Sequence, residues 1–139
     1  MAENQTLKTT LTFDGSSTLS MCEGHPDIAM TGLTDIDAKK PCWSPPHIFV
    51  SSVESCFWLT LLAIADKMRI KIKSFSSHAQ GLLESPDGQH KEFTKITIHP
   101  KIEFENPEDV KKRDLLFKKA EEHCLVARSI KTSIEVIPQ

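Results

Sequence analysis

The spacing of apolar and polar residues predicts short strands at the start of the chain. Apolar residues alternate weakly with polar ones over positions 7–13, and the turn sequence Asp14-Gly15-Ser16-Ser17 separates them from a second alternating stretch, Thr18–Met21. This arrangement is typical of a β-hairpin. Between positions 23 and 41 we expect one short strand at 28–30 and otherwise loop.

A long helix is predicted after Ser44-Pro45-Pro46. Serine caps free backbone donors, and proline at the first helical positions loses no hydrogen bond. The helix is expected to run to about Met68, and its apolar residues surround the axis: Ile48, Phe49, Val50, Val53, Phe57, Trp58, Leu61, Leu62, Ile64 and Ala65. Such a helix is expected to be covered by protein on both sides, at the centre of the core. Its uncharged stretch, 55–65, is shorter than the roughly 20 residues that span a bilayer, so we interpret it as a buried helix and not a membrane anchor.

Two strands are predicted next. Ile70 and Ile72 alternate with charged residues, and the extended segment continues to about Gln80. After the turn Pro86-Asp87-Gly88, a return strand places apolar residues at 96, 98, 102 and 104 on one face. Pro100 shares that face and lacks a backbone donor, which predicts an edge position or a bulge there.

The last third of the chain repeats the helix start signal at Asn106-Pro107-Glu108-Asp109. The helix is expected to end near His123. Its predicted inward residues are Val110, Leu116, Phe117 and Ala120. A short helical turn over 124–130 and a final strand over 132–137 complete an α+β fold, predicted as a single domain over residues 1–139.

Composition narrows the classes of function. The net charge is −2, the pI is near 6.3, and the Lys and Arg residues are spread along the chain, so we expect no nucleic-acid partner. The first residues show neither a basic segment nor an apolar one of the secretory type, which leads us to expect a cytoplasmic protein without membrane contact. Four cysteines without a CxxC pair argue against a closed zinc site and a disulfide framework.

Two of the cysteines are candidates for redox chemistry. Cys56 lies inside the apolar run of the long helix, and Cys124 follows the second helix. A second thiol near the first turns a single oxidation into a cycle. Free cysteines are also commonly buried for packing alone, and this alternative stays open for both. Cys124 has the better intrinsic case for ionisation, because a cysteine at a helix start meets free N–H groups.

Three blocks in order carry a resemblance to a known family. The segments 44–56, 62–70 and 123–128, the last followed by a terminal strand, are similar to those of the osmotically inducible protein C and organic hydroperoxide resistance proteins. The resemblance covers most of the chain from Ser44 onward. It implies an intertwined homodimer with the long helices at its centre and active sites at the subunit interface.

The resemblance also implies an activity. Cys56 corresponds to the peroxidatic cysteine and Cys124 to the resolving one of a thiol-dependent peroxidase that reduces organic hydroperoxides in oxidative-stress defence. No bound cofactor or metal is expected, and an external dithiol, lipoyl-type or other, would regenerate the enzyme. The alternative is a member without peroxidase activity, which binds a small apolar ligand or senses redox state at the dimer-interface cleft.

The resemblance assigns an Arg of the first sheet and a Glu at the start of the long helix to the ionisation of the reactive thiol. This chain has no Arg before Arg69, and Pro46-His47 occupies the acid position. Candidate replacements are Arg128, His123, His47 and Glu54, and for each the alternative is a surface, first-turn or structural residue. Phe49, Val53 and Phe57 are candidates for lining a pocket for an alkyl hydroperoxide, or for packing the core.

Overall fold

The computed structural model describes residues 3–31 and 42–139. These form two compact units, Met1–Phe49 and Val50–Gln139. One helix, α1 (Pro45–Lys67), runs through the boundary between them. The single-domain organisation therefore stays a prediction.

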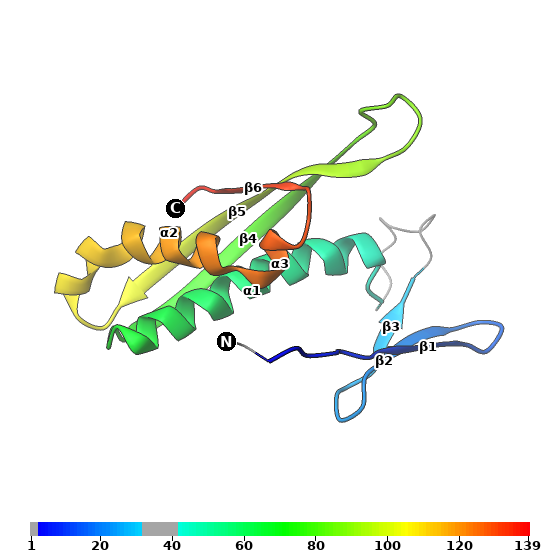
Figure 1. The fold of residues 1–139 in the computed structure, drawn as a ribbon, viewed down its shortest axis with the longest axis horizontal. Coiled ribbons are helices and arrows are strands. Elements are labelled where there is room, and N and C mark those ends of the chain that lie inside the picture. The colour runs from blue at the N-terminus through cyan, green and yellow to red at the C-terminus, as the bar shows by residue number, and fades with distance from the viewer. Residues whose placement is uncertain (1–2, 32–41) are drawn as a thin grey trace. The chain divides into compact units, whose positions relative to one another are not determined.

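The first unit contains a small antiparallel sheet. Its strands are β1 (Thr10–Phe13), β2 (Thr18–Met21) and β3 (Ile28–Met30), paired in the order β1-β2-β3 (Figure 1). The Asp14 carboxylate accepts hydrogen bonds from the backbone N–H groups of Ser16 and Ser17 and so closes the turn between β1 and β2. The predicted hairpin and short third strand are confirmed. The loop expected over 32–41 falls outside the described residues.

Helix α1 begins and ends at recognisable signals. The backbone N–H of His47 donates to Ser44 Oγ at 3.2 Å, which confirms Ser44 as the cap. At the other end Arg69 adopts a left-handed conformation with φ 57°. The N–H of Ile70 bonds to the carbonyl of Ala65 at 2.8 Å, closing the last turn.

Within this chain α1 buries only one stripe. Its buried residues are Val53, Phe57, Leu61 and Ala65, spaced four apart. Leu59 and Leu62, on the other side, are 59% and 41% exposed. The expectation that protein covers this helix on both sides therefore stays a prediction, because within the described residues of this one chain its buried side chains lie on one side only. By length and composition alone α1 is the one helix of the described residues that could cross a membrane, a test that soluble core helices also pass.

The second unit is built on a mixed sheet. Strands β4 (Ile72–Glu84) and β5 (Glu92–Phe104) form a long antiparallel hairpin, and β6 (Ser133–Val136) adds to β5 in parallel. Strand β4 extends beyond the predicted end at Gln80 because the pairing with β5 continues almost to the turn. Ile96 and Ile98 of β5 are fully buried on the face that packs against the helices.

Pro100 lies in the central strand and not at a sheet edge. It pairs with Ser77 of β4, and the register shifts of the hairpin occur elsewhere, near Ile72 and Leu82. The predicted bulge is therefore wrong. The missing donor is tolerated because β6 pairs with β5 only as far as Ile98, while the Pro100 carbonyl accepts from the Gln139 N–H at 2.9 Å.

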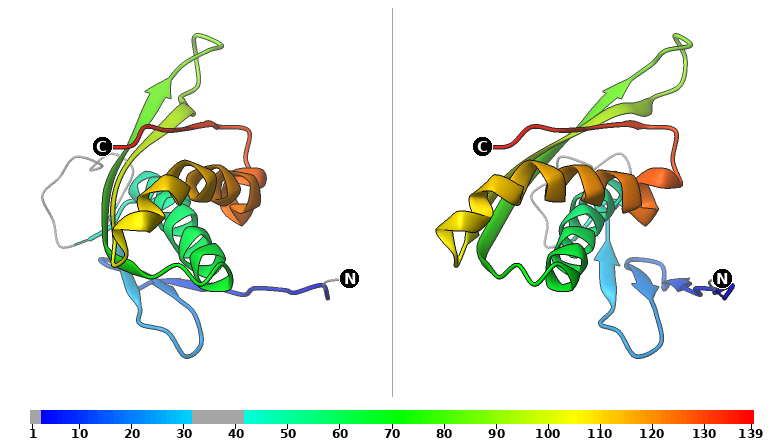
Figure 2. Two further views of the ribbon diagram at one scale, coloured as in Figure 1. Left: turned by 90° about the vertical axis from the view of Figure 1, so that its left-hand side faces the viewer. Right: turned by 60° about the vertical axis from the view of Figure 1, so that its left-hand side comes forward.

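The remaining helices are η2 (Pro107–Lys112), α2 (Arg113–His123) and α3 (Leu125–Arg128). Figure 2 shows α1 and α2 on the same face of the β4-β5-β6 sheet. Their contact includes an edge-to-face pair of Phe57 and Phe117 with centroids 5.8 Å apart. Leu116, Phe117 and Ala120 are buried as predicted. Val110 is 58% exposed, contrary to the prediction, because the first turn is a 3₁₀ helix that does not keep the 3.6-residue period.

Candidate active site

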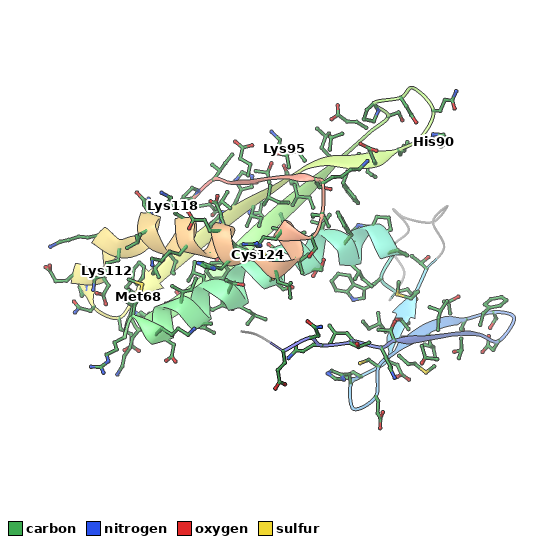
Figure 3. The ribbon with its side chains drawn as sticks, in the orientation of Figure 1. Met68, His90, Lys95, Lys112, Lys118 and Cys124 are labelled. Atoms are coloured by element: carbon green, nitrogen blue, oxygen red, sulfur yellow. The ribbon has the colours of Figure 1, made fainter. Side chains whose placement is uncertain are left out.

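The structure brings the two candidate cysteines together within the second unit. Cys56 is half-buried on α1, and Cys124 is the N-cap residue of α3, only 2% exposed. Figure 3 shows Cys124 at the junction of α2 and α3. Both are free thiols, and each one affects the pKa of the other through a hydrogen bond between them. This proximity is the geometry that a dithiol–disulfide cycle requires.

Cys56 has the environment of a reactive thiol. Burial of its side chain opposes ionisation, but hydrogen bonds outweigh this and hold the pKa of Cys56 below its ordinary value. The donors are the backbone N–H of Val126, the Cys124 thiol, the Thr60 hydroxyl and the backbone N–H of Leu125, in decreasing order of effect. Thr60 Oγ1 lies 3.9 Å from Cys56 Sγ. The start of α3 thus supplies backbone dipoles to a thiolate on α1.

The pKa of Cys124 is shifted in the opposite direction, above its ordinary value. Burial raises the pKa of its thiol, and the neighbouring Cys56 raises it further, although the backbone N–H of Ala127 acts against both. The prediction that Cys124 has the better case for ionisation is wrong. Its place at the start of α3 does provide a donor, but near-complete burial has the larger effect. Cys124 is therefore suited to remain protonated while Cys56 ionises.

A cavity of about 240 Å³ lies beside these residues. It is lined by Val53, Phe57, Ile98, Glu121, Cys124, Ala127, Arg128, Thr132 and Ile134. Two of the predicted lining residues, Val53 and Phe57, are in this wall. Phe49 belongs to the first unit, and its proposed contact with a substrate stays a prediction.

Two of the candidate helper residues lie close to Cys124 in the chain. The Arg128 N–H donates to the Cys124 carbonyl at 3.0 Å, and the Arg128 side chain lines the same cavity as Cys124. Its Nη1 donates to the Glu122 carbonyl at 3.4 Å. His123 is the exposed last residue of α2. Of the two, the structure places Arg128 at the cavity, as the four-residue spacing from Cys124 predicts.

The other two candidates are engaged elsewhere. Glu54 accepts a hydrogen bond from Ser77 Oγ at 2.6 Å and so links α1 to β4. His47, in the first unit, has its Nδ1 2.6 Å from Ser44 Oγ at the helix cap. Both have local structural partners, and their proposed roles beside Cys56 stay predictions.

Sequence reasoning missed three groups at the site. Thr60 lies one helical turn after Cys56, a spacing that places both on one face and that could have revealed it. The N–H groups of Leu125 and Val126 were expected to serve Cys124, on whose own helix they lie. Nothing in the sequence marked Glu121 as a site residue. Burial and the neighbouring Glu122 raise the pKa of its carboxyl.

Metal binding at the thiols has no support in the described residues. Across the described residues, 3–31 and 42–139, no group of three or more His, Cys, Asp and Glu side chains is arranged to hold a metal ion. The site is instead a pair of thiols beside an apolar cavity with one carboxyl and one guanidinium in its wall.

The backbone contribution to Cys56 can be tested at position 125. Leu125 is 70% exposed and occupies the first position of α3, where proline is well accommodated, and Cys124 before it is already extended. We expect Leu125→Pro to raise the pKa of Cys56 because it removes one N–H donor. Leu125→Ala, which keeps the N–H, should leave the pKa unchanged. The pH dependence of alkylation at Cys56 measures both, and equal profiles for the two variants would contradict the assignment.

Fold and site together define an α+β protein in which a long helix sets one cysteine against a second cysteine at the start of a short helix. A family model described as OsmC-like protein matches residues 37–138, and the chain belongs to this family. The resemblance drawn from the three sequence blocks is thereby confirmed.

Solved structures show the same fold. An OsmC-like protein of unknown function from Vibrio cholerae has a TM-score of 0.87 at 19% identity, covering 98% of this chain and 100% of that one. An OsmC-like protein from Mycoplasma pneumoniae has a TM-score of 0.80 at 16% identity, with 99% and 98% covered. The organic hydroperoxide resistance protein OhrB of Bacillus subtilis has a TM-score of 0.72 at 17% identity, with 97% and 98% covered. No curated protein matches the chain.

Proposed function

We propose that this protein reduces organic hydroperoxides through a two-cysteine cycle in cytoplasmic oxidative-stress defence. The observation that carries the proposal is the contact of a half-buried thiol of lowered pKa, Cys56, with a buried thiol of raised pKa, Cys124. The name of the Bacillus subtilis neighbour, an organic hydroperoxide resistance protein, supports the same chemistry.

The steps follow from the lowered pKa of Cys56 and the raised pKa of Cys124. The Cys56 thiolate attacks one oxygen of the O–O bond, the bond breaks, and the departing alkoxide takes up a proton to leave as an alcohol. Cys56 is then a sulfenic acid. The Cys124 thiol gives up its proton and attacks the Cys56 sulfur, so that a disulfide forms and water leaves. An external dithiol, lipoyl-type or other, reduces the disulfide and restores both thiols.

The residues around Cys56 take over what the missing Arg and Glu would do. Backbone N–H groups of α3 and the Thr60 hydroxyl donate to the Cys56 sulfur and stabilise its thiolate. The apolar walls of the cavity, including Val53 and Phe57, are suited to the alkyl part of a hydroperoxide, and Arg128 in the same wall to its polar part.

A stoichiometric pulse of cumene hydroperoxide tests the proposal. We expect two thiols to be lost per chain and peptide mapping to recover a Cys56–Cys124 disulfide, with cumyl alcohol formed in equal amount. Cys22, in the first unit, serves as an internal control because it should stay reduced. Loss of thiols without that disulfide, or no loss at all, would overturn the proposal.

We propose further that the protein acts as a homodimer. Leu59 and Leu62 are exposed on α1, and Leu125 is exposed at the start of α3, next to the thiols. Burial of apolar side chains of this size against a partner chain stabilises the complex. Sedimentation equilibrium should therefore give twice the 15.6 kDa of one chain, and a monomer over the micromolar range would contradict the dimer.

A second function has one observation in its favour. Cys124 lines the cavity, whereas Cys56 is not among the described residues of its wall. A non-peroxidase protein that binds a small apolar ligand or senses redox state would have this arrangement. In that case replacement of both cysteines by serine would leave ligand binding intact, whereas the peroxidase loses its activity.

A further inference from the structure

A pair of histidines lies outside the thiol site, on the other face of the second sheet. His78 of β4 and His99 of β5 are directly opposite each other in the antiparallel register. The neighbouring Ser77 bonds to Glu54 of α1. Because side chains alternate between faces along a strand, His78 and His99 are on the face away from the helices. His78 is exposed and His99 is half-buried.

The two imidazole rings are close and nearly parallel. Their centroids lie 4.6 Å apart and their planes differ by 20°. The rings are therefore stacked, one on each of two paired strands. Two nitrogens bound to one metal ion at 2.0–2.1 Å lie about 3 Å apart. Because the lone pairs of stacked rings lie in nearly parallel planes, both rings must turn out of the stack about their side-chain torsions to direct one nitrogen each at a shared ion.

In the described residues, one hydrogen bond engages the ring nitrogens of this pair. His78 Nδ1 lies 3.0 Å from Gln139 Nε2, and in the part of the chain that the structure describes the His99 ring has no hydrogen-bond partner. Gln139 Nε2 also donates to the His99 backbone carbonyl at 3.0 Å, so the amide keeps that bond when a metal ion takes its place at His78 Nδ1. The flanking pairs on this face, Ser76 with Lys101 and Gln80 with Thr97, include only one charge.

We propose that His78 and His99 form a two-imidazole chelate for a divalent transition metal ion, with water as the remaining ligands. Imidazole nitrogens suit Cu²⁺, Ni²⁺ and Zn²⁺, and the two strands hold them in place before the ion arrives. Once one ring binds, the second binds intramolecularly, so the pair has a higher affinity than any single surface histidine. The site is separate from the thiols and does not depend on the proposed peroxidase cycle.

Ni²⁺ is the probe, because it does not oxidise the thiols. In the unmodified protein, sub-stoichiometric Ni²⁺ should broaden the ring proton signals of His78 and His99 before those of the other histidines, a measurement that needs no variant. In titrations, His78→Ala and His99→Ala should each weaken Ni²⁺ binding by about tenfold or more. His90→Ala is the matched control: His90 lies in the turn between the same two strands (Figure 3) and should leave the affinity unchanged. Broadening that begins at another histidine, or unchanged affinity in either paired variant, would overturn the proposal.

Discussion

Replacement of Cys56 by serine is expected to lower hydroperoxide turnover by at least about 10³-fold, to the level of the protein-free reaction. Serine keeps the size and the hydrogen bonds of the site. It cannot ionise at neutral pH, so the N–H groups of Leu125 and Val126 have no thiolate to stabilise. Peroxide consumption in the presence of a dithiol reductant, run beside the unmodified protein, measures the loss.

Replacement of Cys124 should separate the two steps. Cys124→Ser leaves the attack on the peroxide intact and removes the resolving thiol, so Cys56 accumulates as sulfenic acid after one turnover. A small monothiol reductant should then restore turnover by supplying the missing sulfur. Cys22→Ser, in the first unit, is the control and should behave like the unmodified protein. If Cys56→Ser kept the activity and Cys124→Ser lost it, the two roles would be reversed.

Phe57→Ala is expected to lower the free energy of unfolding by about 3–5 kcal/mol. Phe57 is 2% exposed, meets Phe117 edge to face at 5.8 Å, and joins α1 to α2 beside the cavity. Its removal enlarges a space that already exists, and surrounding groups close it only in part. Urea unfolding followed by circular dichroism gives the difference.

Two comparisons make this result specific. Phe57→Leu keeps most of the apolar volume and should cost much less than Phe57→Ala. Lys118→Ala, on the exposed side of α2, should change the stability by less than about 0.5 kcal/mol. A loss below about 1 kcal/mol in Phe57→Ala would mean that the α1–α2 contact is not a main part of the core.

The sequence predicted most elements because their signals are local. Ser44 and Asn106 start helices through hydrogen bonds to residues two or three positions further on, and these partners are fixed by the chain itself. The strand alternation around Ile96 and Ile98 specifies a buried face in the same way. The prediction that Val110 is buried failed because nothing in its apolar character distinguishes a 3₁₀ turn from an α-helical one.

The candidate site was predictable only in part, for a physical reason. The positions of Cys56 and Cys124 came from motif blocks, and the structure places the two thiols within hydrogen-bond reach of each other. Which thiol ionises depends on burial and on donors from another element, and neither is visible along the chain. Glu121 became a site residue only through the packing of α2 beside the cavity.

The left-handed conformation of Arg69 determines where the chain can accept inserted residues. Its conformation ends α1 and turns the chain so that β4 begins within a few residues, with Ser77 against Glu54 and Phe75 stacked on Trp58 at 4.1 Å. One residue inserted between this turn and β4 would exchange the two faces of the strand, placing His78 against the helix and both contact residues in water. An added residue in the turn at 85–91 does not change which face of β4 meets the helix, so the chain should accept insertions there.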